Sequence, residues 1–245
     1  GADLRLAVSE ACTNAIQAID VAEQDGAVEL AIRGTRPPSY TVFKLQDPPR
    51  LVVDLAGADL LALAEGDGWL YTAVDVTPIY DDHPAVDRVE RELVLIMPDV
   101  LVVFDRVDST GGQQIWQLSS PINPTVSGAR ATFAGSGHSL TVDRVLPAGA
   151  TFSVRPWADG EYSGGYRLDG TVAGGSVRHL HVLSTDGAVT SVAAADAGGN
   201  RGVTINLTDG RTATVRFSPD AVGATLQISG GVDETLAAGV DTLPE

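Results

Sequence analysis

The chain has 245 residues, of which 44% are hydrophobic, so it is long enough to bury a sizeable core. Its 32 acidic residues outnumber its 16 basic residues and give a formal net charge of −16. Nucleic acids and anionic membrane surfaces are bound by clustered lysine and arginine, so this balance excludes both as main partners. No apolar run reaches the ~20 residues of a membrane span, and no membrane insertion is expected. The single cysteine, Cys12, excludes an internal disulfide and a thiolate metal cluster.

Residues 3–22 carry the helical pattern of this chain. Apolar side chains recur there at helical spacings, at Leu4, Val8, Ala11, Ala15 and Ile19. This spacing is typical of an amphipathic α-helix. Asp3 is suited to cap such a helix, and Asp25-Gly26 to end it. We therefore expect an N-terminal helix within residues 1–25.

After this segment the pattern changes to short β-like runs separated by Gly, Pro, Asn and Asp. Two apolar runs, 93–97 and 100–104, are separated only by Pro98-Asp99, which predicts two strands joined by a tight turn. Neither run alternates apolar with polar residues, so both faces of each strand should be covered. Roughly a dozen such runs predict a mainly β fold, a large antiparallel β-sandwich with one N-terminal α-helix. The acidic, glycine-containing residues 231–245 are predicted to form a tail, although a tail that adds a strand to a neighbour has a similar sequence.

A resemblance to a known family runs from Trp69 to Ser184. An Arg-containing run, Val89–Leu95, leads into Pro98–Val107, which ends in Asp-Arg-Val, and a Trp-Gln-Leu run and a His-Leu-His run follow. This order resembles the C-terminal β-sandwich region of heparinase II/III-like polysaccharide lyases. The resemblance implies a β-sandwich over residues 61–230 and an association with carbohydrate. Those lyases hold much of their catalytic apparatus in a helical toroid, for which one helix is too few, so lyase activity is not carried over.

Two shorter segments resemble other families. Tyr40–Leu55 contains a strand, an Asp-Pro-Pro-Arg turn and a Leu-Val-Val-Asp-Leu strand, and within residues 28–56 it resembles the AMIN domains of bacterial cell-envelope proteins. A generic β-hairpin over 26–60 is the alternative. Residues 3–16 resemble the N-box helix of anti-sigma-factor-type ATPases, in which Glu10 would activate water and Asn14 would hold magnesium. The glycine-bearing nucleotide boxes are missing, so a packed amphipathic helix is favoured and no cofactor is expected.

The histidines give no catalytic or metal site. Asp81-Asp82-His83 has no second histidine at ligand spacing, which favours a solvated loop over a metal site. His179 and His181 lie two apart on an expected strand and therefore point to the same face. Such a pair suits metal binding or acid–base chemistry, but a partly exposed sheet surface is the favoured interpretation. No residue is therefore assigned a catalytic role.

Aromatic and acidic residues interleave in one glycine-rich stretch. Aromatic rings cover the apolar faces of sugars, and carboxylates accept hydrogen bonds from sugar hydroxyls. The predicted carbohydrate-binding residues are Trp157, Asp159, Glu161, Tyr162 and Tyr166. The alternatives are a loop pinned to the sandwich by its own aromatic rings, or a protein contact. The high negative charge opposes an anionic sugar unless an arginine patch of Arg88, Arg91 and Arg106 faces the ligand.

The sequence therefore predicts a non-catalytic extracellular or cell-envelope module that supports or contacts polysaccharide. A self-assembling surface or filament subunit is the first alternative, because the edge strands of a sandwich and its termini can pair with a second copy. A fragment of a polysaccharide lyase is the second alternative. Polysaccharide and a second copy of the chain are the partners these hypotheses name.

Overall fold

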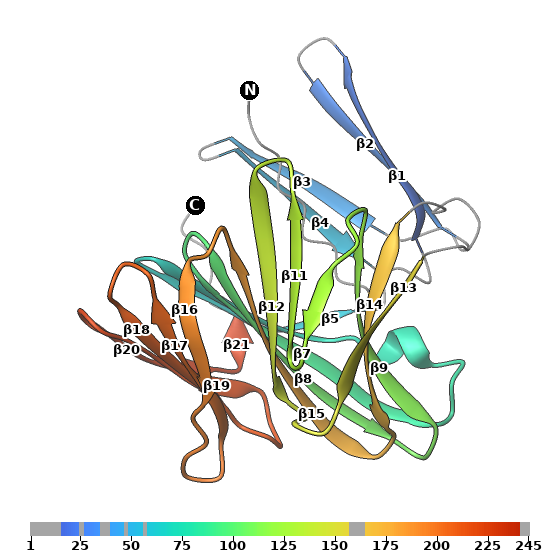
Figure 1. Cartoon of the computed structure of the whole chain (residues 1–245). Coiled ribbons are helices and arrows are strands. Elements are labelled where there is room, and N and C mark those ends of the chain that lie inside the picture. The colour runs from blue at the N-terminus through green and yellow to red at the C-terminus, as the bar shows by residue number, and fades with distance from the viewer. Residues whose placement is uncertain are drawn as a thin grey trace. The chain divides into compact units, whose positions relative to one another are not determined.

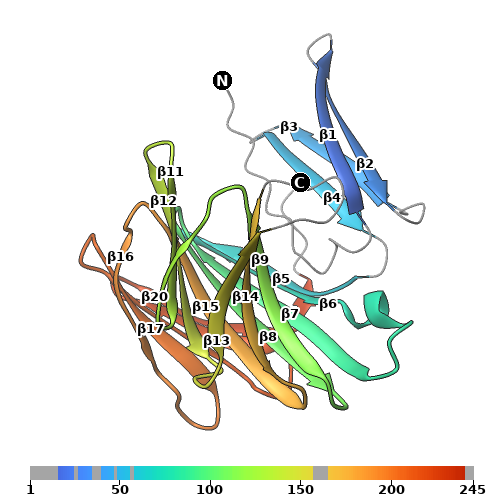
Figure 2. The same ribbon diagram turned by 45° about the vertical axis from the view of Figure 1, so that its right-hand side comes forward.

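The computed structural model describes four strands within residues 16–55 by their backbone, and residues 58–156 and 165–240 in more detail. The chain divides into two units, residues 1–58 and 59–245. Figures 1 and 2 show the strands in two views.

The first unit contains two antiparallel strand pairs. Strand β1 (Ile16–Gln24) pairs with β2 (Ala27–Gly34), and β3 (Tyr40–Gln46) pairs with β4 (Pro49–Leu55). The helix predicted over 3–22 is wrong from Ile16 onward, and residues 1–15 lie outside the described residues. β-Branched side chains such as Ile19 and Val21 favour strands, and an Asp-Gly step between two apolar runs is a hairpin signal as well as a helix end.

The second unit is built on a nine-stranded sheet. Its order is β10-β11-β12-β15-β8-β7-β6-β5-β21, and its pairs are antiparallel except β21 with β5, which is parallel. The strands are β5 (Asp59–Gly66), β6 (Trp69–Asp75), β7 (Val86–Ile96), β8 (Val100–Ser109), β10 (Thr125–Ser127), β11 (Arg130–Gly135), β12 (His138–Leu146), β15 (Ser176–Thr185) and β21 (Gly239–Val240). A short 3-10 helix, η2 (Thr77–Tyr80), precedes β7.

Two smaller sheets complete the unit. A three-stranded sheet has the order β13-β14-β9, and a five-stranded sheet runs from β16 to β20 in sequence order. Figure 1 shows the five-stranded sheet in orange to red, apart from β9, β13 and β14. Their strands are β9 (Gln113–Ser120), β13 (Thr151–Pro156), β14 (Tyr166–Ala173), β16 (Val189–Ala194), β17 (Arg201–Leu207), β18 (Thr212–Phe217), β19 (Gly223–Ile228) and β20 (Val232–Ala237).

The smaller sheets cover opposite faces of the nine-stranded sheet. Phe104 and Leu180 lie in register on one face and join the larger core, which includes Phe217 and Leu226 of the five-stranded sheet. On β15 the alternate residue Leu183 packs with the smaller core, which contains Trp116 and Leu168 of the three-stranded sheet. Successive strand residues point to opposite faces, so one sheet separates two cores. The fold is mainly β with antiparallel sheets, as predicted, and the described residues contain no α-helix.

The turn predicted at Pro98-Asp99 is confirmed, since β7 and β8 pair antiparallel on either side of it, from Ile96 with Val100 onward. β8 is buried on both faces, whereas alternate residues of β7 are only half-buried on one face.

The predicted tail is wrong over most of its length. Strand β20 pairs with β19 and β21 pairs with β5, while residues 241–245 lie outside the described residues. Alternate apolar positions such as Leu236, which is buried, make this segment part of the core.

Candidate functional site

The predicted carbohydrate-binding loop joins β13 to β14. Residues 157–164 lie outside the described residues, and with them four of the five predicted side chains, so this assignment stays a prediction. Tyr166 is described: it opens β14, is half-buried and lies in register with Pro156 and Ser120. The loop therefore begins and ends at the tip of a two-stranded hairpin.

Two arginines lie beside this tip, on the outer face of the three-stranded sheet. Arg155 of β13 is directly in register with Arg167 of β14. Their neighbours Val154 and Leu168 pack into the smaller core, so the two arginines point away from it. Arg167 donates hydrogen bonds to both carboxylate oxygens of Asp169, at 2.6 Å and 2.8 Å, and Arg155 Nε lies 3.3 Å from Asp169 Oδ2. The pairing fixes Arg167 and leaves the Arg155 side chain 52% exposed.

This outer face differs in charge from the rest of the chain. Strands β9, β13 and β14 contain two arginines and one aspartate, against a net charge of −16 for the whole sequence. A guanidinium presents paired N–H groups that match carboxylate and sulfate oxygens. The sequence reasoning missed Arg155 and Arg167. Their signal was their placement, immediately before Pro156-Trp157 and immediately after Tyr166.

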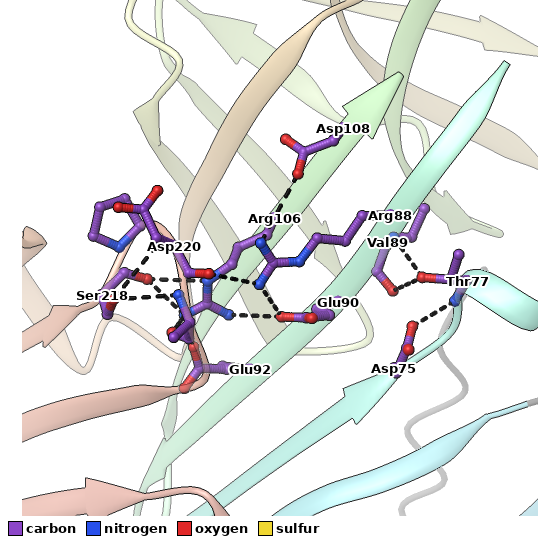
Figure 3. Close-up of polar contacts among 12 residues, drawn as sticks. Asp75, Thr77, Arg88, Val89, Glu90, Glu92, Arg106, Asp108, Ser218 and Asp220 are labelled. Carbon is purple, nitrogen blue, oxygen red and sulfur yellow. Dashed lines mark hydrogen bonds and ion pairs between the residues drawn. The ribbon is translucent and has the colours of Figure 1, made fainter. Parts of the chain in front are cut away.

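The arginine patch predicted from Arg88, Arg91 and Arg106 is wrong as a ligand-facing surface. Arg88 donates to Glu90 at 2.6 Å and to the Asp220 carbonyl at 3.0 Å, as Figure 3 shows. The hydrogen bond with Glu90 raises the pKa of Arg88 above its ordinary value. Arg91 points to the opposite face of the sheet, where its Nε lies 2.5 Å from Asp105 Oδ1. The charges are therefore divided between two faces and matched by carboxylates.

Arg106 is fully buried and holds the segment between β18 and β19 against the nine-stranded sheet by hydrogen bonds. Its guanidinium donates to Glu92, to the Ser218 carbonyl at 2.6 Å and to the Ala221 carbonyl at 2.5 Å. Glu92 in turn accepts hydrogen bonds from the Tyr71 hydroxyl and from the Gly223 backbone N–H, the latter at 3.0 Å. Burial and the adjacent Glu92 raise the pKa of Tyr71 strongly, so the phenol stays protonated. We call Arg106, Glu92 and Tyr71 the buried latch; its geometry points to a structural role.

His179 and His181 share a face, as predicted, but the expectation of a partly exposed surface is wrong. They are 3% and 0% exposed, because β9 covers them. The His181 ring stacks on Trp116 at 3.9 Å between centroids, and His179 Nε2 lies 3.2 Å from the Gln114 side-chain oxygen. Burial lowers the pKa of both histidines, most strongly that of His181. A closed, apolar site of this kind suits packing better than proton transfer.

Two further places in the described residues bear on ligand chemistry, the turn at His83 and a hollow beside β5 and β20. His83 is exposed in the turn after η2, and in the described parts of the chain no three His, Cys, Asp or Glu side chains are grouped to hold a metal. A hollow of about 580 Å³ lies at the turns beside β5 and β20, where its lining includes Trp69, Glu65, Asp67 and Glu234. Its carboxylates disfavour an anionic ligand.

Comparison with known proteins finds similarities for two parts of the chain. Residues 18–66 match the AMIN domain. The match covers β1 from residue 18 onward, then β2, β3, β4 and β5, and it extends the predicted range of 28–56 at both ends. The resemblance of residues 3–16 to an ATPase helix lies, except for Ile16, outside the described residues. No curated protein sequence matches the chain.

The remaining similarity is to solved lyase structures. Heparan sulfate lyase HepC from Pedobacter heparinus superposes with a TM-score of 0.53 at 12% identity, over 68% of this chain and 29% of the lyase. A heparinase III with methylated lysines gives a TM-score of 0.51 at 12% identity, over 66% of this chain and 27% of the other. This chain thus spans less than a third of either enzyme. The predicted resemblance is confirmed as a likeness of fold to part of these lyases.

In the described residues no helix is both long and apolar enough to cross a membrane.

Proposed function

We propose that this chain is a non-catalytic cell-envelope or extracellular module that contacts polysaccharide. One observation carries the proposal: an AMIN domain, which is typical of bacterial envelope proteins, is followed by a β fold similar to part of heparan sulfate lyases. The fold supplies a rigid support, and the sugar contacts would lie on surfaces that the support presents.

Two features of the second unit support a non-catalytic role. The histidine pair is buried under β9, and Arg106 and Glu92 bind each other within the buried latch. The histidine and glutamate side chains, which are types that transfer protons in active sites, therefore support a structural role here. A lyase fragment predicts the contrary, that the chain alone cleaves heparan sulfate by β-elimination and generates new ultraviolet absorbance.

The proposed contact surface is the outer face of the three-stranded sheet at the tip of the β13–β14 hairpin. Arg155 is exposed there, Arg167 is oriented by Asp169, and Tyr166 begins the adjoining strand. The predicted residues Trp157, Asp159, Glu161 and Tyr162 lie in the connection between these strands. Arginine forks and aromatic rings together suit a sugar chain that carries carboxylate or sulfate groups.

The test is a glycan-binding titration of the full chain with heparan sulfate and, separately, a neutral glucan. Arg155→Ala should weaken binding about tenfold, since a hydrogen bond to a charged group contributes roughly 1.5–3 kcal/mol. Trp157→Ala should weaken binding by a similar factor, because it removes the ring that would cover the apolar face of a sugar. Arg130→Ala is the matched control, because Arg130 is also about half exposed and paired with an aspartate. Equal binding by all variants, or no binding by the unaltered chain, would reject the proposed surface.

A further inference from the structure

One face of the nine-stranded sheet carries leucines that belong to neither core. They lie on β5, β6, β7 and β8, and we call them the leucine face: Leu60, Leu63, Leu70, Leu93, Leu95 and Leu101. The strand registers place them together, since Leu70 pairs with Leu95 and Leu95 pairs with Leu101. Leu63 and Leu93 both pair with Thr72 in the next row.

The leucine face is distinct from the packed interior of the second unit. The larger core uses the alternate residues of the same strands, such as Val94 and Val102, which face the five-stranded sheet. The smaller core lies farther along the same sheet face, over β15, β12 and β11, and borders the leucine face where Leu183 pairs with Leu101. Leu60 is 49% exposed and the other five leucines are half-buried. A contiguous apolar surface of this kind marks an interaction site in a protein.

The leucine face is nearly neutral, although the chain as a whole is strongly acidic. Its register rows contain the Arg91–Asp105 ion pair, with Glu65 beside Leu70 at the margin. Two copies of a chain with net charge −16 repel each other wherever their acidic surfaces meet. An uncharged face is the place where identical copies can approach, and a two-fold axis brings the same patch of both copies together.

The three-stranded sheet covers only part of this face of the nine-stranded sheet. Its strand β9 lies over β15, as the stacking of Trp116 on His181 shows, and the neighbouring strands β8 to β5 carry the leucine face. Packed sheets lie ~10 Å apart, so a second sheet over β5–β8 would continue the layer that begins with β9. Under two-fold symmetry, the sheet of the second copy occupies that layer and its own leucine face is covered in return.

We propose that the leucine face is a self-association surface, and that its occupant is the leucine face of a second copy of this chain. The partner is inferred from chemistry and charge, because an apolar and nearly neutral sheet face suits the same face of an identical chain. This role is independent of the proposed polysaccharide contact, which uses the outer face of the three-stranded sheet.

Sedimentation velocity of the full chain tests the proposal, over a range of micromolar concentrations at low and high salt. The unaltered chain should form a dimer, and the dimer should be tighter at high salt because salt screens the repulsion between copies. Leu95→Asp and Leu60→Asp should each weaken the dimer about tenfold or more, because each places a charge against an apolar partner surface. Ile115→Asp is the matched control: Ile115 is 43% exposed on β9, outside the leucine face, and its variant should dimerise normally.

Leu60→Asp keeps the test decisive if Leu95→Asp fails to fold, because Leu60 is already largely exposed; circular dichroism identifies the folded variants. A chain that stays monomeric at every concentration and salt level would overturn the proposal. So would an oligomer that both aspartate variants leave unchanged, since its contacts would then lie on another surface.

Discussion

At the scale of single residues, the buried latch joins sequence positions that lie far apart. Arg106 and Glu92 are both fully buried. The Arg106 guanidinium also donates hydrogen bonds to backbone carbonyls of the segment that leads into β19. A buried ion pair contributes little net stability compared with apolar residues, but removal of one partner leaves an uncompensated charge. The latch therefore specifies where this segment sits, and it should be sensitive to substitution of either partner.

Glu92→Gln should lower the free energy of unfolding by about 3 kcal/mol, because Arg106 would keep its buried charge without a carboxylate. Urea denaturation followed by fluorescence measures this difference. Arg130→Gln is the comparison, since the Arg130 side chain is 46% exposed in its pair with Asp143 and surface pairs contribute about 0–1 kcal/mol. If both variants lose the same small amount of stability, the latch is not a stabilising arrangement.

The Arg106 and Arg91 side chains show what the sequence can and cannot reveal at this scale. All three arginines of the predicted patch are present in β7 and β8, and the strands themselves were predicted from their apolar runs. Which carboxylate each arginine meets depends on pairing between strands and on the segment around Ser218, more than a hundred positions away. No local pattern carries that information, so the patch and its partners could not be separated before the fold was known.

At the scale of elements, the contact of β9 with β15 makes stability depend on pH. Burial, Arg91 and Arg144 lower the pKa of His181, and at His179 burial outweighs the raising effect of Asp105. Folding therefore favours the neutral form of both histidines, while an unfolded histidine has a pKa of about 6.5. Below that pH the unfolded state binds more protons than the folded state. The free energy of unfolding should then fall by up to about 1.4 kcal/mol per pH unit for each histidine.

His181→Leu should flatten this dependence between pH 7 and pH 5. Neither ring nitrogen of His181 has a hydrogen-bond partner, so the substitution breaks no hydrogen bond. Chemical denaturation at several pH values measures the slope, with His83→Gln as the control because His83 is exposed. A variant with the slope of the unaltered chain would mean that other groups, such as the carboxylates, set the pH dependence.

The element scale also shows why the sequence predicts hairpins better than layers. Turn residues between two apolar runs predicted the local pair β7–β8, which the structure contains. The strand β1 was missed because its apolar residues fit a helical spacing as well as a strand. The separation of β9, β13 and β14 into a third sheet depends on side chains that meet only after folding, such as Trp116 and His181.

At the scale of the whole molecule, the end of the AMIN match and the start of the second compact unit fall at different residues. The match ends at residue 66, whereas the second unit begins at Asp59 and includes β5. Ala62 of β5 is fully buried in the larger core, and β5 is the strand with which β21 pairs. The strand therefore belongs structurally to the nine-stranded sheet, although it falls within the matched AMIN residues.

Two fragments distinguish these boundaries. Residues 59–245 should show a cooperative thermal transition, because both cores consist of residues from this range. Residues 67–245 should melt at a markedly lower temperature or lose the transition, since β6 would become an edge strand and its neighbours in the core would be exposed to water. Circular dichroism melting curves of the two fragments decide the matter. Equal melting of both would assign β5 to the AMIN domain alone, and failure of the longer fragment to fold would show that the second unit needs residues before Asp59.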